Sequence, residues 1–195
     1  MTTVTKTRKL VGTAMLAAVS VVLMFLAFPV PLMPSFIKLD LAELPALIGA
    51  FAYGPLWGVV IEAVKNALHL FQTQTGGIGE LANFLMGSAL VLPAGLIYAR
   101  SKSRKTALIG CLAGSVCMGV MAALANYFIL LPMFEMFMPI EQVIAAFAQL
   151  VPFIRTKLDV VLYNALPVNL CKGLAISLVT MLLYKHLSPI LKGKR

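Results

Sequence analysis

Long apolar runs alternate with short polar segments along this chain, and the pattern predicts a bundle of membrane-spanning helices. A helix needs about 20 apolar residues to cross the hydrocarbon core of a bilayer. We therefore expect spans at about 10–28, 42–53, 56–71, 80–99, 106–131 and 160–184. The first run follows basic residues as in a signal peptide, but it is longer than the usual apolar part of one, so we interpret it as a retained span. The predicted fold is an all-α membrane protein, a six-transmembrane-helix bundle that forms a single domain over residues 1–195.

Two breaks in the pattern shape this expectation. The first run is followed by "PVPLMPSFIKLD", whose prolines remove backbone donors and restrict the residues before them, so we expect an irregular, ordered loop. The second break is Gly54-Pro55, inside the apolar run at 44–71. It indicates a broken pair of short helices, and such helices in a membrane bundle often line a site. The alternative is one kinked helix.

Composition supports the membrane class, and the positions of the charges favour the broken pair. The chain is 61% hydrophobic and 12% charged, which excludes an ordinary soluble domain. Its net charge of +9 comes from basic clusters at the two termini and at 100–105. The terminal clusters lack the interleaved aromatic residues that single-stranded nucleic acid would need for stacking. Six spans place all three clusters on one side, which the positive-inside rule makes cytoplasmic, whereas one kinked helix would separate them.

Familiar enzyme motifs are missing from the sequence. It has no phosphate-binding Gly-x-x-x-x-Gly-Lys-[Ser/Thr] loop and no His-Glu-x-x-His segment, and it contains only two histidines. Its three cysteines, Cys111, Cys117 and Cys171, are scattered in apolar runs, which argues against a zinc site or a disulfide framework. We therefore do not expect an enzyme, a metal centre or a resident cofactor.

Ionisable and amide side chains inside the apolar helices need an explanation, because a charge at a helix centre costs about 2.5–3.5 kcal/mol on insertion scales. Glu62, Lys65, Asn66 and His69 follow the spacing i, i+3, i+4, i+7 and share one helical stripe. One interpretation is a self-contained Glu62–Lys65 ion pair that holds helices together. The other is that part of the stripe faces a ligand or a partner, with Asn66 and His69 nearest the outer end.

The segment "TQTGGIGELANFLMG" places Glu80 and Asn83 on one face at the mouth of an apolar helix. The glycines before them, including Gly79, would let the backbone approach a ligand closely. A simple helix cap at Thr75 or Glu80 is the alternative, but a cap does not require Asn83 one turn deeper.

The last apolar run, "YNALPVNLCKG", carries Asn164, Asn169 and Lys172. Lys172 would lie about 18 Å from the outer end of its helix, too deep for its side chain to reach the interface easily, so it needs a partner or a polar cavity. Asn126 in the preceding span is open to two interpretations, since a buried amide can simply bond across helices. These side chains suit a ligand with many hydrogen-bonding groups, an apolar body and little net charge. A cation channel would instead favour rings of carboxylates.

Three segments together resemble a known family, over about residues 10–184. "FIKLDLAELPALIGAFAYGPLWGVVIEAVKNALHLF" resembles the substrate-binding S components of energy-coupling-factor (ECF) vitamin transporters, and "TGGIGELANFLMG" and "LPVNLCKG" resemble the riboflavin-specific members. The resemblance implies six helices with cytoplasmic termini in a bacterial cell membrane, a pocket near the outer face, and a lid-like loop after the first helix. It also implies riboflavin as the transported ligand, a membrane coupling (T) subunit, and two ATPase subunits that alone use ATP.

The same resemblance implies roles for individual residues. The expected riboflavin-binding residues are Glu80, Asn83, Asn126, Asn164, Asn169, Lys172, Lys38, Asp40, Leu41 and Gly79. Ala14 and Ala18 match the family's Ala-x-x-x-Ala motif for docking the coupling subunit. One departure is Ala42, where many relatives have serine, so a minor loop contact is in doubt. The alternatives are an S component for another vitamin, such as thiamine or biotin, and an autonomous secondary vitamin transporter.

Overall fold

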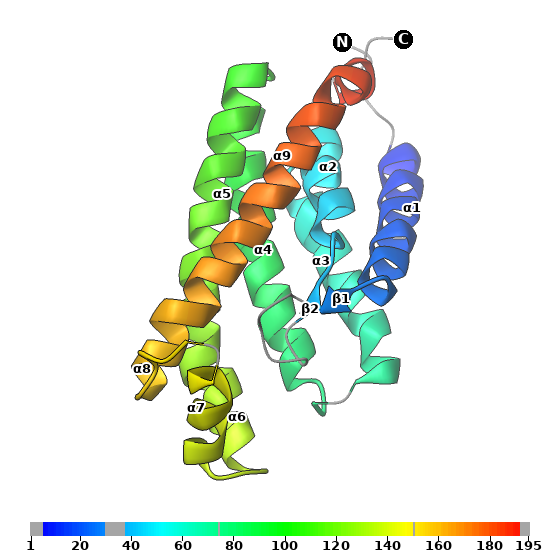
Figure 1. Cartoon of the computed structure of the whole chain (residues 1–195). Coiled ribbons are helices and arrows are strands. Elements are labelled where there is room, and N and C mark those ends of the chain that lie inside the picture. The colour runs from blue at the N-terminus through cyan, green and yellow to red at the C-terminus, as the bar shows by residue number, and fades with distance from the viewer. Residues whose placement is uncertain (1–5, 30–37, 74, 150, 192–195) are drawn as a thin grey trace.

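The computed structural model describes residues 6–29, 38–73, 75–149 and 151–191, and the side chains of 28, 29, 38, 39 and 185–191 are outside that description. The described chain is almost entirely helical (Figure 1). The principal helices are α1 (Lys6–Phe25), α2 (Glu43–Tyr53), α3 (Pro55–His69), α4 (Ile78–Arg100), α5 (Arg104–Ala125) and α9 (Leu166–Leu191). Shorter elements are η1 (Leu70–Gln72), η2 (Asn126–Leu130), α6 (Leu131–Glu135), α7 (Ile140–Ala148), α8 (Lys157–Val160) and η3 (Val161–Ala165).

Four continuous helical segments of the described chain are long and apolar enough to cross a membrane. They are Lys6–Phe25, Ile78–Arg100, Arg104–Glu135 and Lys157–Tyr184. The helices α2 and α3 have 11 and 15 residues, or about 16 and 22 Å, and each is short for a full crossing. The prediction of an all-α membrane protein is therefore confirmed as far as the fold class is concerned.

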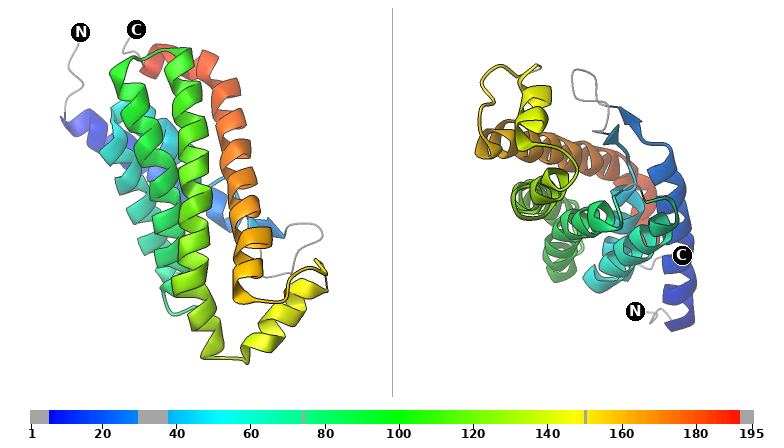
Figure 2. Two further views of the ribbon diagram at one scale, coloured as in Figure 1. Left: turned by 90° about the vertical axis from the view of Figure 1, so that its left-hand side faces the viewer. Right: turned by 90° about the horizontal axis from the view of Figure 1, so that it is seen from below.

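The chain reverses direction at Gly54, between α2 and α3. Positions on either side of this turn meet: a Cβ atom at Gly58 would lie 2.7 Å from Cβ of Ala50, and one at Gly49 would lie 2.3 Å from Cδ1 of Ile61. Gly54 has φ = 114° and ψ = 161°, a conformation essentially restricted to glycine. These contacts exclude a single kinked helix, and successive principal helices run in alternating directions (Figures 1 and 2).

Two wide helical turns interrupt the long segments at the end of the bundle opposite the termini. Both η2 and η3 are π-helical, and Pro132 and Pro167 follow them. A proline inside a helix has no N–H to donate and clashes with the carbonyl four residues earlier, here those of Phe128 and Tyr163. The helix widens around that carbonyl, and such π-turns are frequent at functional sites.

The segment after α1 forms a two-residue antiparallel pairing between β1 (Phe28–Pro29) and β2 (Lys38–Leu39). The expected lid falls mainly on residues 30–37, which lie outside the described residues. Ala42, the expected departure from the family pattern, is buried, and its backbone carbonyl accepts a hydrogen bond from Ser20 of α1. Its N–H donates to Oδ1 of Asp40 at 2.8 Å, so the backbone anchors the end of this segment.

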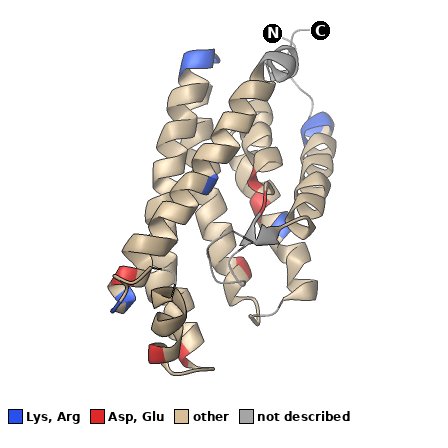
Figure 3. Cartoon of the chain, in the orientation of Figure 1, with Lys and Arg blue, Asp and Glu red and all other residues tan. Residues whose placement is uncertain are grey.

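Charge is distributed unevenly along the bundle (Figure 3). The basic residues at the start of α1 and in the α4–α5 loop lie at one end, whereas the acidic residues of the described chain lie in the middle and at the opposite end, together with a few further basic residues. The first and last described helices both reach the basic end (Figure 1).

Candidate functional site

A cavity of about 340 Å³ gathers most of the predicted polar residues. It lies between α4, the two π-turns and α9, and we call it the amide cavity. Its polar lining residues are Asp40, Gly79, Asn83, Asn126, Asn164, Asn169 and Lys172. Its apolar lining residues are Met86, Leu130, Leu131, Phe134, Phe147, Val160, Ala165 and Val168. An apolar wall with a few convergent polar groups is the usual composition of a small-molecule site.

Two asparagines of the amide cavity are held by their own helices. Nδ2 of Asn126 donates to the carbonyl of Ala122 at 2.8 Å, and Nδ2 of Asn169 donates to the carbonyl of Ala165 at 2.9 Å. Both bonds leave the amide oxygen as an acceptor on a half-buried side chain. The site can therefore accept hydrogen bonds from a ligand at fixed positions.

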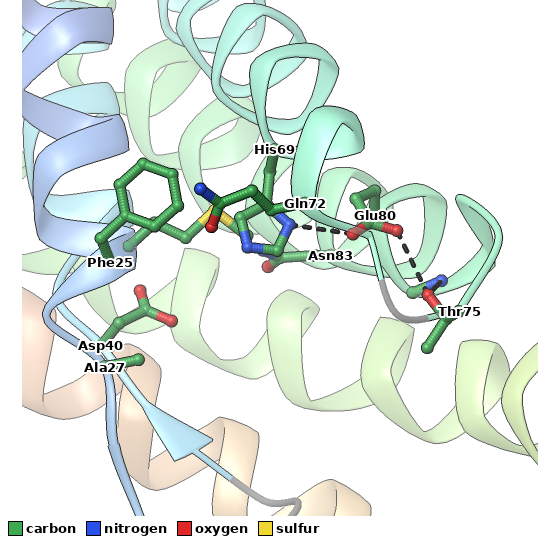
Figure 4. A pocket seen from close by; sticks show the side chains of 10 residues that line it. Phe25, Ala27, Asp40, His69, Gln72, Thr75, Glu80 and Asn83 are labelled. Atoms are coloured by element: carbon green, nitrogen blue, oxygen red, sulfur yellow. Dashed lines mark hydrogen bonds and ion pairs between the residues drawn. The ribbon is translucent and has the colours of Figure 1, made fainter.

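A second cavity, of about 480 Å³, adjoins the first, and we call it the glutamate cavity (Figure 4). Asp40, Gly79 and Asn83 line both cavities. The remaining lining residues are Met24, Phe25, Ala27, His69, Gln72, Thr75 and Glu80. Glu80 thus belongs to the adjoining space and not to the wall of the amide cavity, although it shares a helix face with Asn83.

Glu80 is also the organising acceptor of the turn between α3 and α4. Its Oε1 lies 2.8 Å from Nδ1 of His69, and its Oε2 accepts from Oγ1 of Thr73 at 2.9 Å and from Oγ1 of Thr75 at 3.2 Å. Figure 4 shows the contacts to His69 and Thr75. Within this turn Gly76 and Gly77 have φ of 62° and 92°, which glycine adopts without strain. The N-cap of α4 is Gly77, which makes no side-chain cap hydrogen bond, so Glu80 joins the side chains of this turn instead of capping the helix. The hydroxyl of Thr75 accepts from the N–H of Gly79 at 3.0 Å.

A buried ion network lies beside the amide cavity. Nζ of Lys172 is 3.2 Å from Oδ2 of Asp40 and 3.0 Å from Oε2 of Glu43. Oε1 of Glu43 is 3.2 Å from Nζ of Lys65, which in turn lies 2.6 Å from Oε2 of Glu62. Burial raises the pKa of the Asp40 carboxyl above its ordinary value and repulsion from Glu43 adds to this, whereas the two lysines oppose it. Lys172 thus has both a partner and a polar cavity.

The sequence pattern located some members of this region and missed others. Leu41 is 37% exposed and lines neither cavity, and the side chain of Lys38 is outside the described residues. Asn66 lines neither cavity, whereas His69 lines the glutamate cavity. The pattern missed Glu43, which is fully buried. An acidic residue in the first turn of a helix is explained locally, because it lies near the positive end of the helix dipole. Nothing in the sequence therefore indicated that Glu43 has a distant partner such as Lys172.

The two alanines of the predicted docking motif lie on the outward face of α1. Ala14 and Ala18 are exposed, and their neighbours Met15 and Val19 are exposed too. Ala17 is 2% exposed and packs into the core. The helix therefore presents a face of small and apolar side chains away from the bundle, where a further helix could approach closely.

The fold and the cavities define a helical protein of the membrane-spanning class with two adjoining cavities of mixed polar and apolar lining. The chain belongs to the family described as "ECF transporter, substrate-specific component", whose sequence model matches residues 8–184. This is a family of transporter components and not of enzymes.

Known proteins of this family resemble the chain over nearly its whole length. It is 32% identical over 186 residues to the riboflavin transporter RibU of Staphylococcus aureus, covering 95% of this chain and 93% of that one. It is 31% identical over 193 residues to the riboflavin transporter FmnP of Bacillus subtilis, covering 97% of each. A solved structure of the S component of a bacterial ECF transporter superposes with a TM-score of 0.77 at 30% identity, covering 96% of this chain and 99% of that one.

Proposed function

We propose that this chain is the high-affinity riboflavin-binding subunit of an ECF-type transporter and mediates riboflavin uptake. The observation that carries the proposal is the convergence of Asn83, Asn126, Asn164, Asn169 and Lys172 on one cavity with an apolar wall. Relatives named riboflavin transporters match the chain over 95–97% of its length, which supports this choice over thiamine or biotin.

Riboflavin has the chemistry that the two adjoining cavities require. Its flat ring system is largely apolar, with carbonyl and imide groups at one edge, and its ribityl chain carries several hydroxyl groups. The ring would contact side chains such as Met86, Phe134 and Phe147, and the hydroxyls would bond to the asparagine oxygens and to Lys172. Riboflavin carries no net charge, and the charge of Lys172 is already balanced by Asp40 and Glu43, so the site needs no charged ligand.

The orientation that we propose follows from the charge distribution. The basic end, with both termini and the α4–α5 loop, would face the cytoplasm in a bacterial cell membrane, and the two cavities would open toward the outer face. With α2 and α3 counted as separate passages, the chain would cross six times. We further propose that the segment between β1 and β2 covers the bound ligand, since Asp40, directly after β2, lines both cavities.

Uptake would need partner subunits. We propose that a membrane coupling (T) subunit docks on the face of α1 that carries Ala14 and Ala18, and that two separate ATPase subunits hydrolyse ATP. The sequence of this chain has no phosphate-binding loop motif of its own, in agreement with this division of labour.

The absorbance spectrum of the protein purified from riboflavin-containing medium is the direct test. A yellow protein with the visible bands of a flavin, followed by saturable quenching of riboflavin fluorescence by the stripped protein, is the expected result. Saturable binding of thiamine or biotin with no flavin bound would refute the choice of ligand. Uptake into vesicles that lack every ATPase subunit would favour an autonomous secondary transporter.

A further inference from the structure

We propose that Glu43 is a positioning residue for ligand binding: it holds the ammonium group of Lys172 at the wall of the amide cavity. Glu43 itself lines neither cavity. The inference rests on the proposed function, because it takes Lys172 as a riboflavin contact.

The geometry around Glu43 is that of a bridge between two buried cations. Its carboxylate is completely buried, with Oε1 3.1 Å and Oε2 3.0 Å from Nζ of Lys172. Oε1 also accepts a hydrogen bond from Nζ of Lys65 at 3.2 Å. One carboxylate from the first turn of α2 thus joins α9 to α3.

The N–H donors of the Lys172 ammonium group explain how the bridge through Glu43 prepares this lysine for a ligand. An ammonium group has three N–H donors and no acceptor. Two carboxylates, those of Asp40 and Glu43, accept from Lys172 in the described structure, which leaves one donor for a ligand acceptor in the cavity. A flexible lysine held at two points loses less entropy when it bonds to a ligand, and preorganisation of this kind increases affinity.

Lys65 contacts Glu43 on the side away from the cavities, and Glu62 in turn pairs with Lys65. Lys65 is fully buried and lies 2.6 Å from Glu62, and neither residue lines a cavity. Glu62 packs against α4, where a Cβ atom at Gly87 would lie 2.3 Å from its Oε2. The charged groups of the described chain that face Glu43 are therefore Lys172 and Asp40 on the cavity side and Lys65 and Glu62 on the other.

A double-mutant cycle between Glu43 and Lys172 tests this role. Riboflavin affinity is measured by fluorescence quenching in detergent for the intact chain, Glu43→Gln, Lys172→Met and the double variant, with the melting temperature of each ligand-free protein. We expect each single variant to lose about tenfold in affinity, as for one charged hydrogen bond. In the Lys172→Met background, Glu43→Gln should cost less than about twofold, because its effect passes through Lys172. Glu62→Gln, a matched buried carboxylate whose ion pair in the described chain is with Lys65 and not with Lys172, should cost less than about threefold.

A triple variant keeps the test informative if Glu43→Gln alone destabilises the protein. Glu43→Gln/Glu62→Gln/Lys65→Met removes the charges behind Lys172 together, so that neither Lys65 nor Glu62 is left buried without its ion-pair partner. This variant should fold and still bind riboflavin about tenfold more weakly than the intact chain. Recovery of full affinity would show that Glu43 serves only to neutralise Lys65 and would overturn the proposal.

The remaining outcomes separate the two proposals. Full affinity in Glu43→Gln, or a loss that adds in full to that of Lys172→Met, would overturn the positioning role while leaving the riboflavin site intact. Full affinity in Lys172→Met would overturn the lysine contact and the positioning role with it. Absence of riboflavin binding by the intact chain would refute the proposed function itself.

Discussion

Nδ1 of His69 lies 2.8 Å from Oε1 of Glu80, and this contact ties the end of α3 to the first turn of α4. The other carboxylate oxygen of Glu80 accepts from two threonine hydroxyls of the intervening turn. One side chain thus fixes the segment that carries Gly79 and Asn83 to the shared wall of the two cavities.

Replacing Glu80 should therefore weaken ligand binding through the wall of the site. Glu80→Ala removes the acceptor of three contacts, and we expect riboflavin affinity to fall about tenfold and the melting temperature to fall by several degrees. Titration of fluorescence quenching and thermal unfolding in detergent measure the two effects. Glu141→Ala, at an exposed position in the first turn of α7, is the matched control and should change neither. An unaltered affinity in Glu80→Ala would show that the turn does not position the site.

The cavity asparagines should matter individually. Asn126→Ala and Asn169→Ala each remove an amide oxygen that faces the proposed ligand, and we expect each to cost about 1 kcal/mol, or about fivefold in riboflavin affinity. Asn66→Ala is the control, since Asn66 makes the same bond to the carbonyl four residues earlier, at 2.9 Å, but lines neither cavity. Equal losses at all three positions would point to a structural role for these amides.

Gly54 should be required because of its backbone conformation and not because a side chain would lack room there. A Cβ atom there would meet nothing within 4 Å, yet φ is 114°. Gly54→Ala should therefore destabilise the protein by about 1–3 kcal/mol through backbone strain alone. Gly119→Ala, inside α5, is the comparison: its Cβ would lie 3.3 Å from Cβ of Leu170, and its φ is not strained. Chemical or thermal unfolding measures both, and a larger loss at Gly119 would contradict this account.

The exposed face of α1 should serve uptake and not binding. Ala14→Leu and Ala18→Leu add bulk to exposed positions, so riboflavin binding and thermal stability of the isolated subunit should persist while uptake with the partner subunits is lost. Ala17→Leu adds the same bulk to a buried position and should lower the melting temperature instead, through overpacking. If Ala14→Leu abolished binding in detergent, that face would be structural.

The sequence alone was enough for the membrane class, the helical segments and much of the polar lining. Apolar runs and their breaks are local properties, because the length of a span and the effect of Gly54-Pro55 on the backbone depend on neighbouring residues only. Asn126, Asn164, Asn169 and Lys172 were recognised because polar groups in apolar helices are costly and therefore conspicuous. The choice of riboflavin came from resemblance and not from spacing.

Tertiary structure decided which of these groups share a space and which groups balance one another. Glu43 lies 129 positions from Lys172 along the chain, yet the two are in direct contact, and Asp40 reaches the same lysine over 132 positions. Glu80 and Asn83 share a helix face, but only Asn83 lines both cavities. Helical periodicity specifies the direction of a side chain relative to its own helix, whereas packing of α2, α3 and α9 specifies what it meets. Because the energy of a buried charge depends on that partner, the role of Glu43 follows only from the folded chain.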